Sequence, residues 1–245
     1  MKQPVFEGDT SIQPIVGVSA PAMKILALEF SSAQRSAAVV HGPPDARRQL
    51  LSEAIESGAR SSRVLGLVDE ALQQAALERE QIECVVVGLG PGSYTGIRMA
   101  IALAQGWQLA RPVKLLGISS AECIAAQAHA EGLTGRIEVV IDAQRGEFYL
   151  AGYEVDAQGW SEVTPLRLSS RADVAARQQA GGILVGPDLG NGFAGCRPVY
   201  PRAAMLGQLA GGRTGFVPGE QLQPIYLRET TFVKAPPPRF KLPEA

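Results

Sequence analysis

The sequence predicts an α/β protein built from two related units, and two similar segments carry this prediction. An apolar run at 24–30 is followed, after the short polar turn SSAQ, by a second β-like run at 35–40. At 137–155 a strand that ends in VVID is followed by a polar turn and a second apolar run. In both places an apolar strand ends in a carboxylate and leads into a hairpin. Because the pattern occurs twice, we expect a duplicated α/β unit.

The segments outside the two hairpins predict further helices and strands. Apolar residues at spacings of three and four predict an amphipathic helix over 61–76, with Ser61 and Ser62 as candidate N-caps. IECVVVGL at 82–89 predicts a buried strand, and the glycine-rich turn after it leads into a helix from about Thr95 to Ala110. We also expect strands at 114–119 and 182–188, and helices at 121–130, 172–179 and 203–210.

These elements divide the chain into four segments. Residues 1–22 are interrupted by Pro and Gly without periodicity, which predicts a flexible extension. We expect a first unit at 23–117 and a second at 118–233, with the last helix and tail of the second packing back on the first. Residues 234–245 form a Pro-rich tail, typical of extended, exposed chain.

The composition limits the classes of function. Of 245 residues, 46% are hydrophobic and 19% charged, as in a globular protein, and the formal net charge of −1 argues against tight autonomous binding of nucleic acid. Three widely spaced cysteines and two distant histidines, His41 and His129, predict neither disulfides nor a metal site. Without a signal peptide or an apolar run long enough to span a bilayer, the sequence indicates a cytoplasmic protein with no membrane contact.

The stretch VVVGLGPGSYTGIRMAIALAQGW at 85–107 invites a test for nucleotide binding. It lacks the Lys of a phosphate-binding P-loop, because Ile97 follows Gly96, and its glycines do not fit the dinucleotide-binding spacing. Pro91 stands where a nucleophile elbow needs Gly. Two interpretations are left: an anion site at the helix start, or a turn that needs glycine and is capped by Ser93. We predict no cofactor, and the weak candidates for one are Ser31, Ser32, Ser93 and Thr95.

The helix after this turn is apolar on nearly every face. Between Ile97 and Leu109 only Arg98, Gln105 and Gln108 are strongly polar. Gly96, Ala100 and Ala104 recur every four residues and leave a smooth face for close helix contact. Deep burial in the core and contact with a partner explain this pattern equally well.

The two strand-end carboxylates, Glu29 and Asp142, also allow two interpretations. They could act as an acid–base pair across a cleft, or each could cap its own turn. The second is the commoner arrangement. Arg145, in the second turn, could meet a phosphate or one of these carboxylates.

Four motifs resemble the bacterial TsaB (YeaZ) family. They are ILALEFSS, GLGPGSYTGIRMAIALAQG, VVIDAQRGEFYLAGYE and PIYLRE, in the family's order and spacing from Ile25 to about Lys234. The resemblance implies an actin-like ATPase (ASKHA) fold, with two RNase H-like subdomains of which the second is reduced.

The resemblance also implies a function. TsaB is the noncatalytic subunit that binds and activates TsaD, which transfers a threonylcarbamoyl group to N6 of the adenosine adjacent to the tRNA anticodon. The small ATPase TsaE joins the complex, so contact with tRNA would be indirect, and the chain could form a homodimer when TsaD is absent. An enzyme of its own, a nucleotide hydrolase or a peptidase, is the alternative suggested by the family's older glycoprotease name.

In the TsaB family the contact with TsaD uses two helices from each protein, which correspond here to about 61–76 and 93–110. The interface residues implied by this match are Arg60, Val64, Leu65, Val68, Leu72, Tyr94, Ile97, Arg98, Ala100, Ile101, Ala104 and Trp107. The chain departs from the family pattern at Glu29 and Phe30, usually Asp and Thr, and at Arg60 and Gly66, commonly His and Pro. Phe30 removes a hydroxyl from the expected phosphate position, which argues against nucleotide binding.

Overall fold

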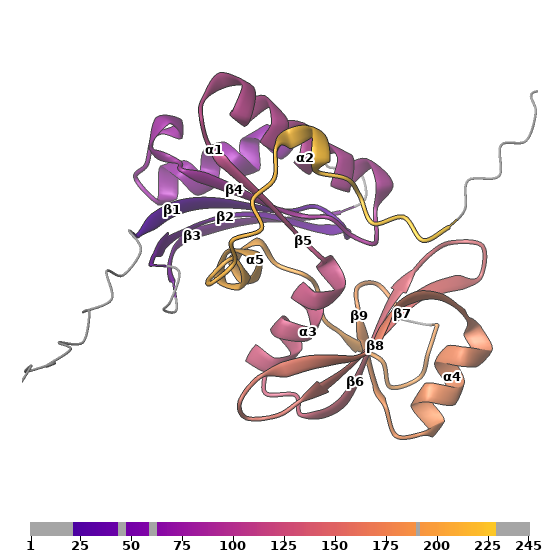
Figure 1. The fold of residues 1–245 in the computed structure, drawn as a ribbon. Coiled ribbons are helices and arrows are strands. Elements are labelled where there is room, and N and C mark those ends of the chain that lie inside the picture. The colour runs from indigo at the N-terminus through magenta and orange to yellow at the C-terminus, as the bar shows by residue number, and fades with distance from the viewer. Residues whose placement is uncertain (1–21, 44–47, 59–62, 190–191, 229–245) are drawn as a thin grey trace, which may run out of the picture.

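The computed structural model describes residues 22–43, 48–58, 63–189 and 192–228, which form two sheets with helices around and between them (Figure 1). The strands are β1 (Met23–Glu29), β2 (Gln34–Gly42), β3 (Gln49–Ser57), β4 (Cys84–Gly88), β5 (Lys114–Ile118), β6 (Gly135–Asp142), β7 (Glu147–Val155), β8 (Trp160–Ser170), β9 (Ile183–Gly186) and β10 (Arg197–Pro198). The helices are α1 (Val64–Gln74), α2 (Tyr94–Ala110), α3 (Ser120–Ala130), α4 (Arg171–Gln179) and α5 (Ala203–Leu209). Two 3-10 turns are η1 (Arg79–Gln81) and η2 (Gly219–Gln221).

The two sheets have the same topology. The first has the order β3-β2-β1-β4-β5, and the second, taken in the matching direction, β8-β7-β6-β9-β10. In each sheet the first three strands pair antiparallel and the last two add in parallel. The predicted duplicated α/β unit is therefore confirmed. We call the sheet of β1 to β5 with α1 and α2 the first half, and the sheet of β6 to β10 with α4 the second half.

The second half is the reduced copy. In the first half, α2 connects β4 to β5, whereas the described residues between β9 and β10 contain no helix. β10 is also only two residues long, against five in β5. This agrees with the predicted actin-like fold, in which the second RNase H-like unit is shortened.

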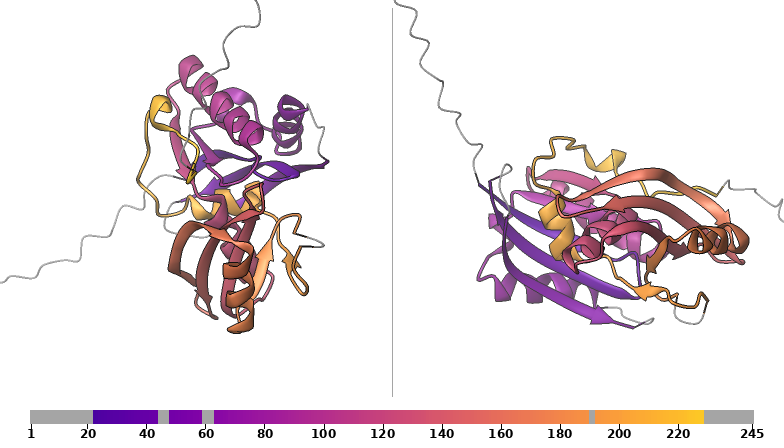
Figure 2. Two further views of the ribbon diagram at one scale, coloured as in Figure 1. Left: turned by 90° about the vertical axis from the view of Figure 1, so that its right-hand side faces the viewer. Right: turned by 90° about the horizontal axis from the view of Figure 1, so that it is seen from below.

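Helices cover both faces of the first sheet. α1 and α2 share one core cluster with the strands, and this cluster includes Leu28, Val87 and Ile97. α5 covers the opposite face, and α3 contacts both α5 and the second sheet, so α3 and α5 lie between the two sheets. α1 and α2 therefore lie on the side of the first sheet that faces away from the second half (Figure 2). With both faces covered, the central strands are continuous apolar runs.

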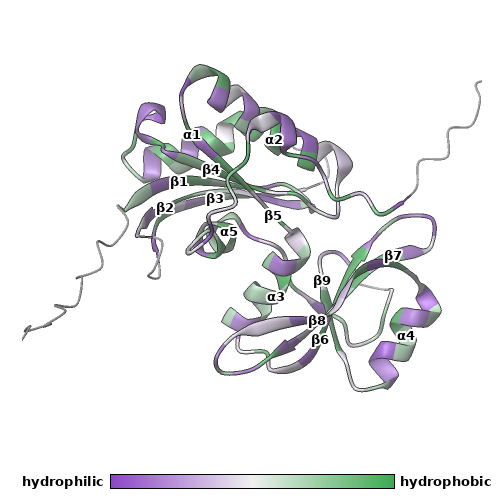
Figure 3. Cartoon of the chain, viewed as in Figure 1, coloured by the Kyte–Doolittle hydropathy of each residue, from purple (hydrophilic) through white to green (hydrophobic). Residues whose placement is uncertain are grey.

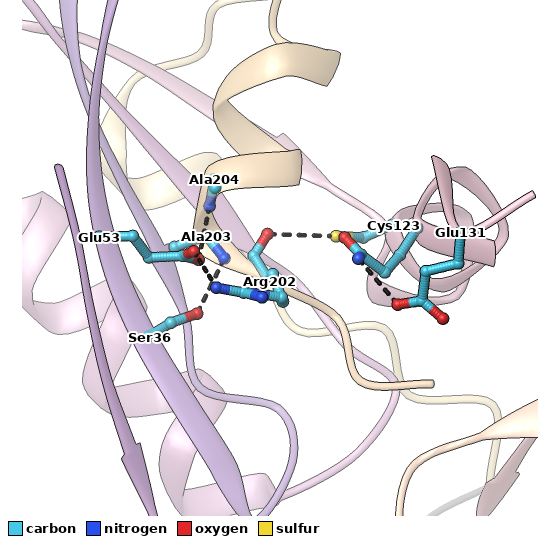
Figure 4. Close-up of polar contacts among 8 residues, drawn as sticks. Ser36, Glu53, Cys123, Glu131, Arg202, Ala203 and Ala204 are labelled. Atoms are coloured by element: carbon cyan, nitrogen blue, oxygen red, sulfur yellow. Dashed lines mark hydrogen bonds and ion pairs between the residues drawn. The ribbon is translucent and has the colours of Figure 1, made fainter. Parts of the chain in front are cut away.

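The start of α5 is anchored to the first sheet by polar contacts (Figure 4). The amide of Ala203 donates to Ser36 Oγ (2.8 Å), and that of Ala204 donates to Glu53 Oε1 (3.0 Å). Arg202 also forms an ion pair with the nearly buried Glu53. These bonds satisfy amides that a helix start leaves without partners.

Most expected elements are present, but three strands were not predicted. β3 and β8 were missed because their residues are partly exposed and mixed in polarity, and β10 because it is only two residues long. α1 begins at Val64, and Arg63 at its N-cap makes no side-chain cap bond. Ser61 and Ser62, like residues 1–21 and 234–245, lie outside the described residues. None of the described helices has the length and apolar character needed to cross a membrane.

Candidate functional site

A cleft of about 700 Å³ opens where the strands of both halves end. Its walls come from the turns that follow β1, β4, β6 and β9 and from the segment 225–228. Carboxyl ends of strands are a common place for ligands in α/β folds. The side chains that line it include Ser31, Ser32, Arg35, Ser93, Tyr94, Asp142, Arg145, Asp188, Tyr226 and Arg228.

The strand-end carboxylates cap their own turns. The amide of Ser31 donates to Glu29 Oε1 (2.8 Å), and the amide of Gln144 donates to Asp142 Oδ1 (2.7 Å). Glu29 is fully buried and also accepts from the Ser120 hydroxyl (2.9 Å), and it does not line the cleft. Burial raises the pKa of Glu29, although its bonds to Ser31 and Ser120 lower it in part. The turn-capping interpretation is therefore the one the structure favours.

Packing explains the glycine-rich turn. A Cβ on Gly96 would lie 1.9 Å from the carbonyl oxygen of Phe30, and one on Gly92 would lie 2.1 Å from that of Ser31. Gly90 and Gly92 adopt positive φ angles of 84° and 151°. Ser93 Oγ accepts from the Gly96 amide (3.3 Å) and so caps α2. The glycines let the turn approach the end of β1 closely, and this confirms the structural interpretation of the turn.

The four candidate hydroxyls do not converge as a set. Ser31, Ser32 and Ser93 line the cleft, but Thr95 is exposed and does not. The hydroxyl of Ser32 bonds within its own turn, donating to the carbonyl of Gln34 (2.8 Å). Phe30 is buried in the core of the first half and does not line the cleft, and the expectation that the missing hydroxyl at this position disfavours a nucleotide stays a prediction.

The charges in the cleft are mixed. Arg35, Arg145 and Arg228 face it together with two carboxylates, Asp142 and Asp188. Asp188 accepts from the Tyr200 hydroxyl (2.7 Å), and Asp142 is engaged in its turn. Within the described ranges, no group of three or more His, Cys, Asp or Glu side chains is placed to hold a metal ion. The cleft can admit a polar ligand, but its two carboxylates are each held by a neighbouring group.

The helix surface expected to bind a partner is only partly exposed. The structure buries seven of the predicted contact residues in the core of the first half: Val64, Val68, Leu72, Ile97, Ala100, Ile101 and Ala104. These residues cannot meet a partner in this conformation, because they pack against the chain's own sheet. The face formed by Gly96, Ala100 and Ala104 is thus a core face. Trp107 is half-buried, and Arg60 lies outside the described residues.

The outer faces of α1 and α2 nevertheless carry large exposed apolar side chains. Leu65 is 59% exposed, Tyr94 57% and Leu109 90%. Hydrophobic and hydrophilic segments alternate along both helices (Figure 3). Leu109 was not predicted as a contact residue, and neither were the exposed residues Tyr226 and Leu227 near the C-terminal end of the described chain. The exposure of Leu109 could not be read from a helix that is apolar on all sides.

Comparisons with known proteins identify relatives over nearly the whole chain. A family model described as TsaD, tRNA N6-adenosine threonylcarbamoyltransferase, matches residues 54–185. The chain is 29% identical to the tRNA threonylcarbamoyladenosine biosynthesis protein TsaB of Escherichia coli, over 88% of this chain and 99% of that protein. It is 33% identical to the Bacillus subtilis protein of the same name, over 43% of this chain and 45% of that one.

A solved structure agrees with these matches. The Pseudomonas aeruginosa protein described as similar to the peptidase YeaZ aligns with a TM-score of 0.71 at 26% identity, over 84% of this chain and 100% of that chain. Together with the two matching sheets, it confirms the predicted fold class. The chain therefore belongs to the TsaD family and, within it, to the TsaB (YeaZ) group.

Proposed function

We propose that this chain is the noncatalytic subunit that binds and activates a TsaD-type threonylcarbamoyltransferase in the modification of tRNA adenosine. The observation that carries the proposal is the exposed apolar surface on the helices that the family uses for this contact. Large apolar side chains exposed on surface helices are typical of a protein–protein interface.

The contact surface that we propose differs from the one the motifs implied. It consists of the outward-facing residues Leu65, Tyr94, Arg98, Ala102 and Leu109, each of them exposed. Tyr94 and Arg98 support each other, since Arg98 Nη1 donates to the Tyr94 hydroxyl (2.9 Å). Tyrosine and arginine are enriched among the residues that contribute most to binding, and such preorganised pairs lose little freedom when a partner docks. The buried residues support this surface from below.

The function is tested by reconstitution. TsaD, TsaE and the enzyme that supplies the threonylcarbamoyl adenylate are combined with unmodified tRNA, with and without this chain, and modified adenosine is measured. We expect the modification to depend on the chain. Equal modification without it would contradict the proposal.

The same reagents test the alternatives. If the chain were a hydrolase, it would cleave ATP or a peptide on its own, and Glu29 or Asp142 variants would lose that activity. Gel filtration of the chain alone and with TsaD distinguishes a homodimer from the heterodimer, and addition of TsaE shows whether it joins the same complex. A chain that stays monomeric in the presence of TsaD would contradict the proposed interface.

A further inference from the structure

The fourth sequence motif, PIYLR at 224–228, has no part in the proposed contact on α1 and α2 apart from its approach to Tyr94. It belongs to a C-terminal segment, 217–228, that runs along the first half. The amide of Val217 donates to the carbonyl of Leu115 (3.0 Å), and the amide of Ile225 donates to the carbonyl of Leu89 (2.9 Å). Gly219 bonds to α2 in both directions, through Gln108 (2.7 Å) and Gln105 (2.8 Å). The segment is therefore held by the first half over most of its length (Figure 1).

Tyr226 adds an aromatic contact at the start of α2. Its ring stacks on that of Tyr94, with centroids 5.5 Å apart and planes 25° from parallel. The guanidinium of Arg98 lies 5.3 Å from the centre of the Tyr94 ring. Stacked rings and a cation over one of them fix the position of the segment at the rim of the cleft.

Two residues further along, the segment reaches the second half. Arg228 Nη2 donates to the carbonyls of Ala143 (3.0 Å) and Gln144 (3.3 Å) and to Glu147 Oε2 (2.6 Å). These acceptors lie in the AQRGE part of the third motif, which comprises the turn between β6 and β7 and the first residue of β7, Glu147. An arginine suits this task because its planar, permanently charged group donates several bonds in fixed directions.

The turn is built so that its carbonyls face Arg228. Gln144 and Arg145 both have left-handed backbones, with φ of 64° and 60°, and Gly146 follows with φ of 78°. The amide of Ala143 donates to the carbonyl of Glu147 (3.0 Å), which closes the turn. The carbonyls of Ala143 and Gln144, which Arg228 bonds, lie in this closed turn.

We propose that residues 224–228 form a clasp between the two halves. The clasp joins the glycine-rich turn and the start of α2 in the first half to the β6–β7 turn in the second half. It thereby sets how far the cleft between the halves opens. α3 and α5 join the halves between the sheets, and the clasp joins them at the cleft. This inference concerns the isolated chain and does not rest on the proposed binding of TsaD.

Hydrogen exchange of the full chain, measured by mass spectrometry without any partner, tests the clasp. Arg228→Ala should accelerate exchange of the amides at 143–147 by roughly five- to tenfold, since local opening loses a charge-assisted bond. Arg228→Lys, which keeps the charge but loses the planar guanidinium whose Nη2 donates these bonds, should give an intermediate rate. Arg79→Ala is the matched control, because it removes an ion pair with Asp69 within the first half.

Tyr226→Ala separates a clasp from a local role of Arg228. Tyr226 stacks on the first half, and among the described residues no hydrogen bond, ion pair or ring contact joins its side chain to the β6–β7 turn. If the segment couples the halves, this variant also accelerates exchange at 143–147, and the double variant adds little to Arg228→Ala. Unchanged exchange at 143–147 in Tyr226→Ala or in Arg228→Ala would overturn the proposal, whatever the outcome of the binding experiments with TsaD.

Discussion

The two halves of the molecule share one topology but differ in what surrounds it. The first sheet carries two helices on its outer face, and its strand-end carboxylate, Glu29, is fully buried. The second sheet carries the short α4 on one face, and its counterpart, Asp142, is exposed at the cleft. The longest helix of the described chain, α2, has no equivalent among the described residues of the second half. The two copies of the repeated unit have thus diverged. The first half carries an exposed apolar helix surface, and the smaller second half forms one side of the cleft.

The largest effect is expected at the core face of α2. Ala104→Asp should destabilise the chain by about 4 kcal/mol, because it places an unpaired charge where the side chain is fully buried. Ala102→Asp, on the exposed face of the same helix, should change stability by less than about 0.5 kcal/mol. Urea unfolding followed by circular dichroism measures both. Similar losses in the two variants would refute the assignment of the faces.

A cavity in the second half should lower the free energy of unfolding by a smaller amount and leave binding to TsaD unchanged. Val174 is the buried residue of α4, and Val174→Ala is expected to cost about 2 kcal/mol. Because α4 packs on the second sheet whereas α1 and α2 pack on the first, the affinity for TsaD should stay within about twofold of the unmodified chain. A large loss of affinity in a folded Val174→Ala variant would show that the second half takes part in the contact.

Variants at the two serine N-caps compare a helix of the first half, α2, with a helix of the second half, α4. Ser93 caps α2, and Ser170 caps α4 in a capping box with Asp173. Replacing either by Ala should cost about 1 kcal/mol in unfolding experiments. The loss at Ser170 should be the larger one, because its hydroxyl also donates to Asp173 Oδ2 (2.8 Å). A larger loss at Ser93 would mean that the glycine-rich turn depends on the hydroxyl for more than the cap.

The smallest expected effect is the pH dependence of the free energy of unfolding at Glu29. Burial raises the pKa of Glu29, so the folded chain binds this proton more tightly than the unfolded chain. The bound proton therefore stabilises the fold at low pH, and this contribution to the free energy of unfolding is lost as the pH rises above the ordinary carboxyl range. Glu29→Gln should therefore become more stable relative to the original chain as the pH rises above the ordinary carboxyl range. Asp142→Asn, at the exposed position, serves as the comparison. A stability difference for Glu29→Gln that falls with rising pH would contradict the account.

Residue patterns predicted most of the fold, because apolar periodicity and turn residues mark buried strands and helices. Strands β3 and β8 were missed because both are antiparallel edge strands. Each has a partly exposed face, so its sequence shows little difference in hydrophobicity between the two faces. The repetition of a strand, a carboxylate and a hairpin was visible in the sequence because both copies keep it.

The sites were harder to predict. α2 is apolar on all sides, so its sequence does not show that Ala100 and Ala104 face the sheet while Leu109 faces outward. The clasp could not be predicted from the sequence either, because Tyr226 and Arg228 contact segments that are distant in the sequence. Gly96 is needed because the backbone of α2 passes close to the carbonyl of Phe30, which leaves no room for a Cβ. This contact joins residues that are distant in the sequence, so no local pattern predicts it.

The central claim is that the exposed faces of α1 and α2 bind TsaD. The most direct test is titration calorimetry of the chain with TsaD from the same organism, comparing Leu65→Glu combined with Leu109→Glu against Val163→Glu, an exposed apolar position on β8. We predict that the double variant loses at least about tenfold in affinity while staying folded, and that Val163→Glu binds within about twofold of the original chain. Unchanged affinity in the double variant, or a comparable loss in Val163→Glu, would contradict the account.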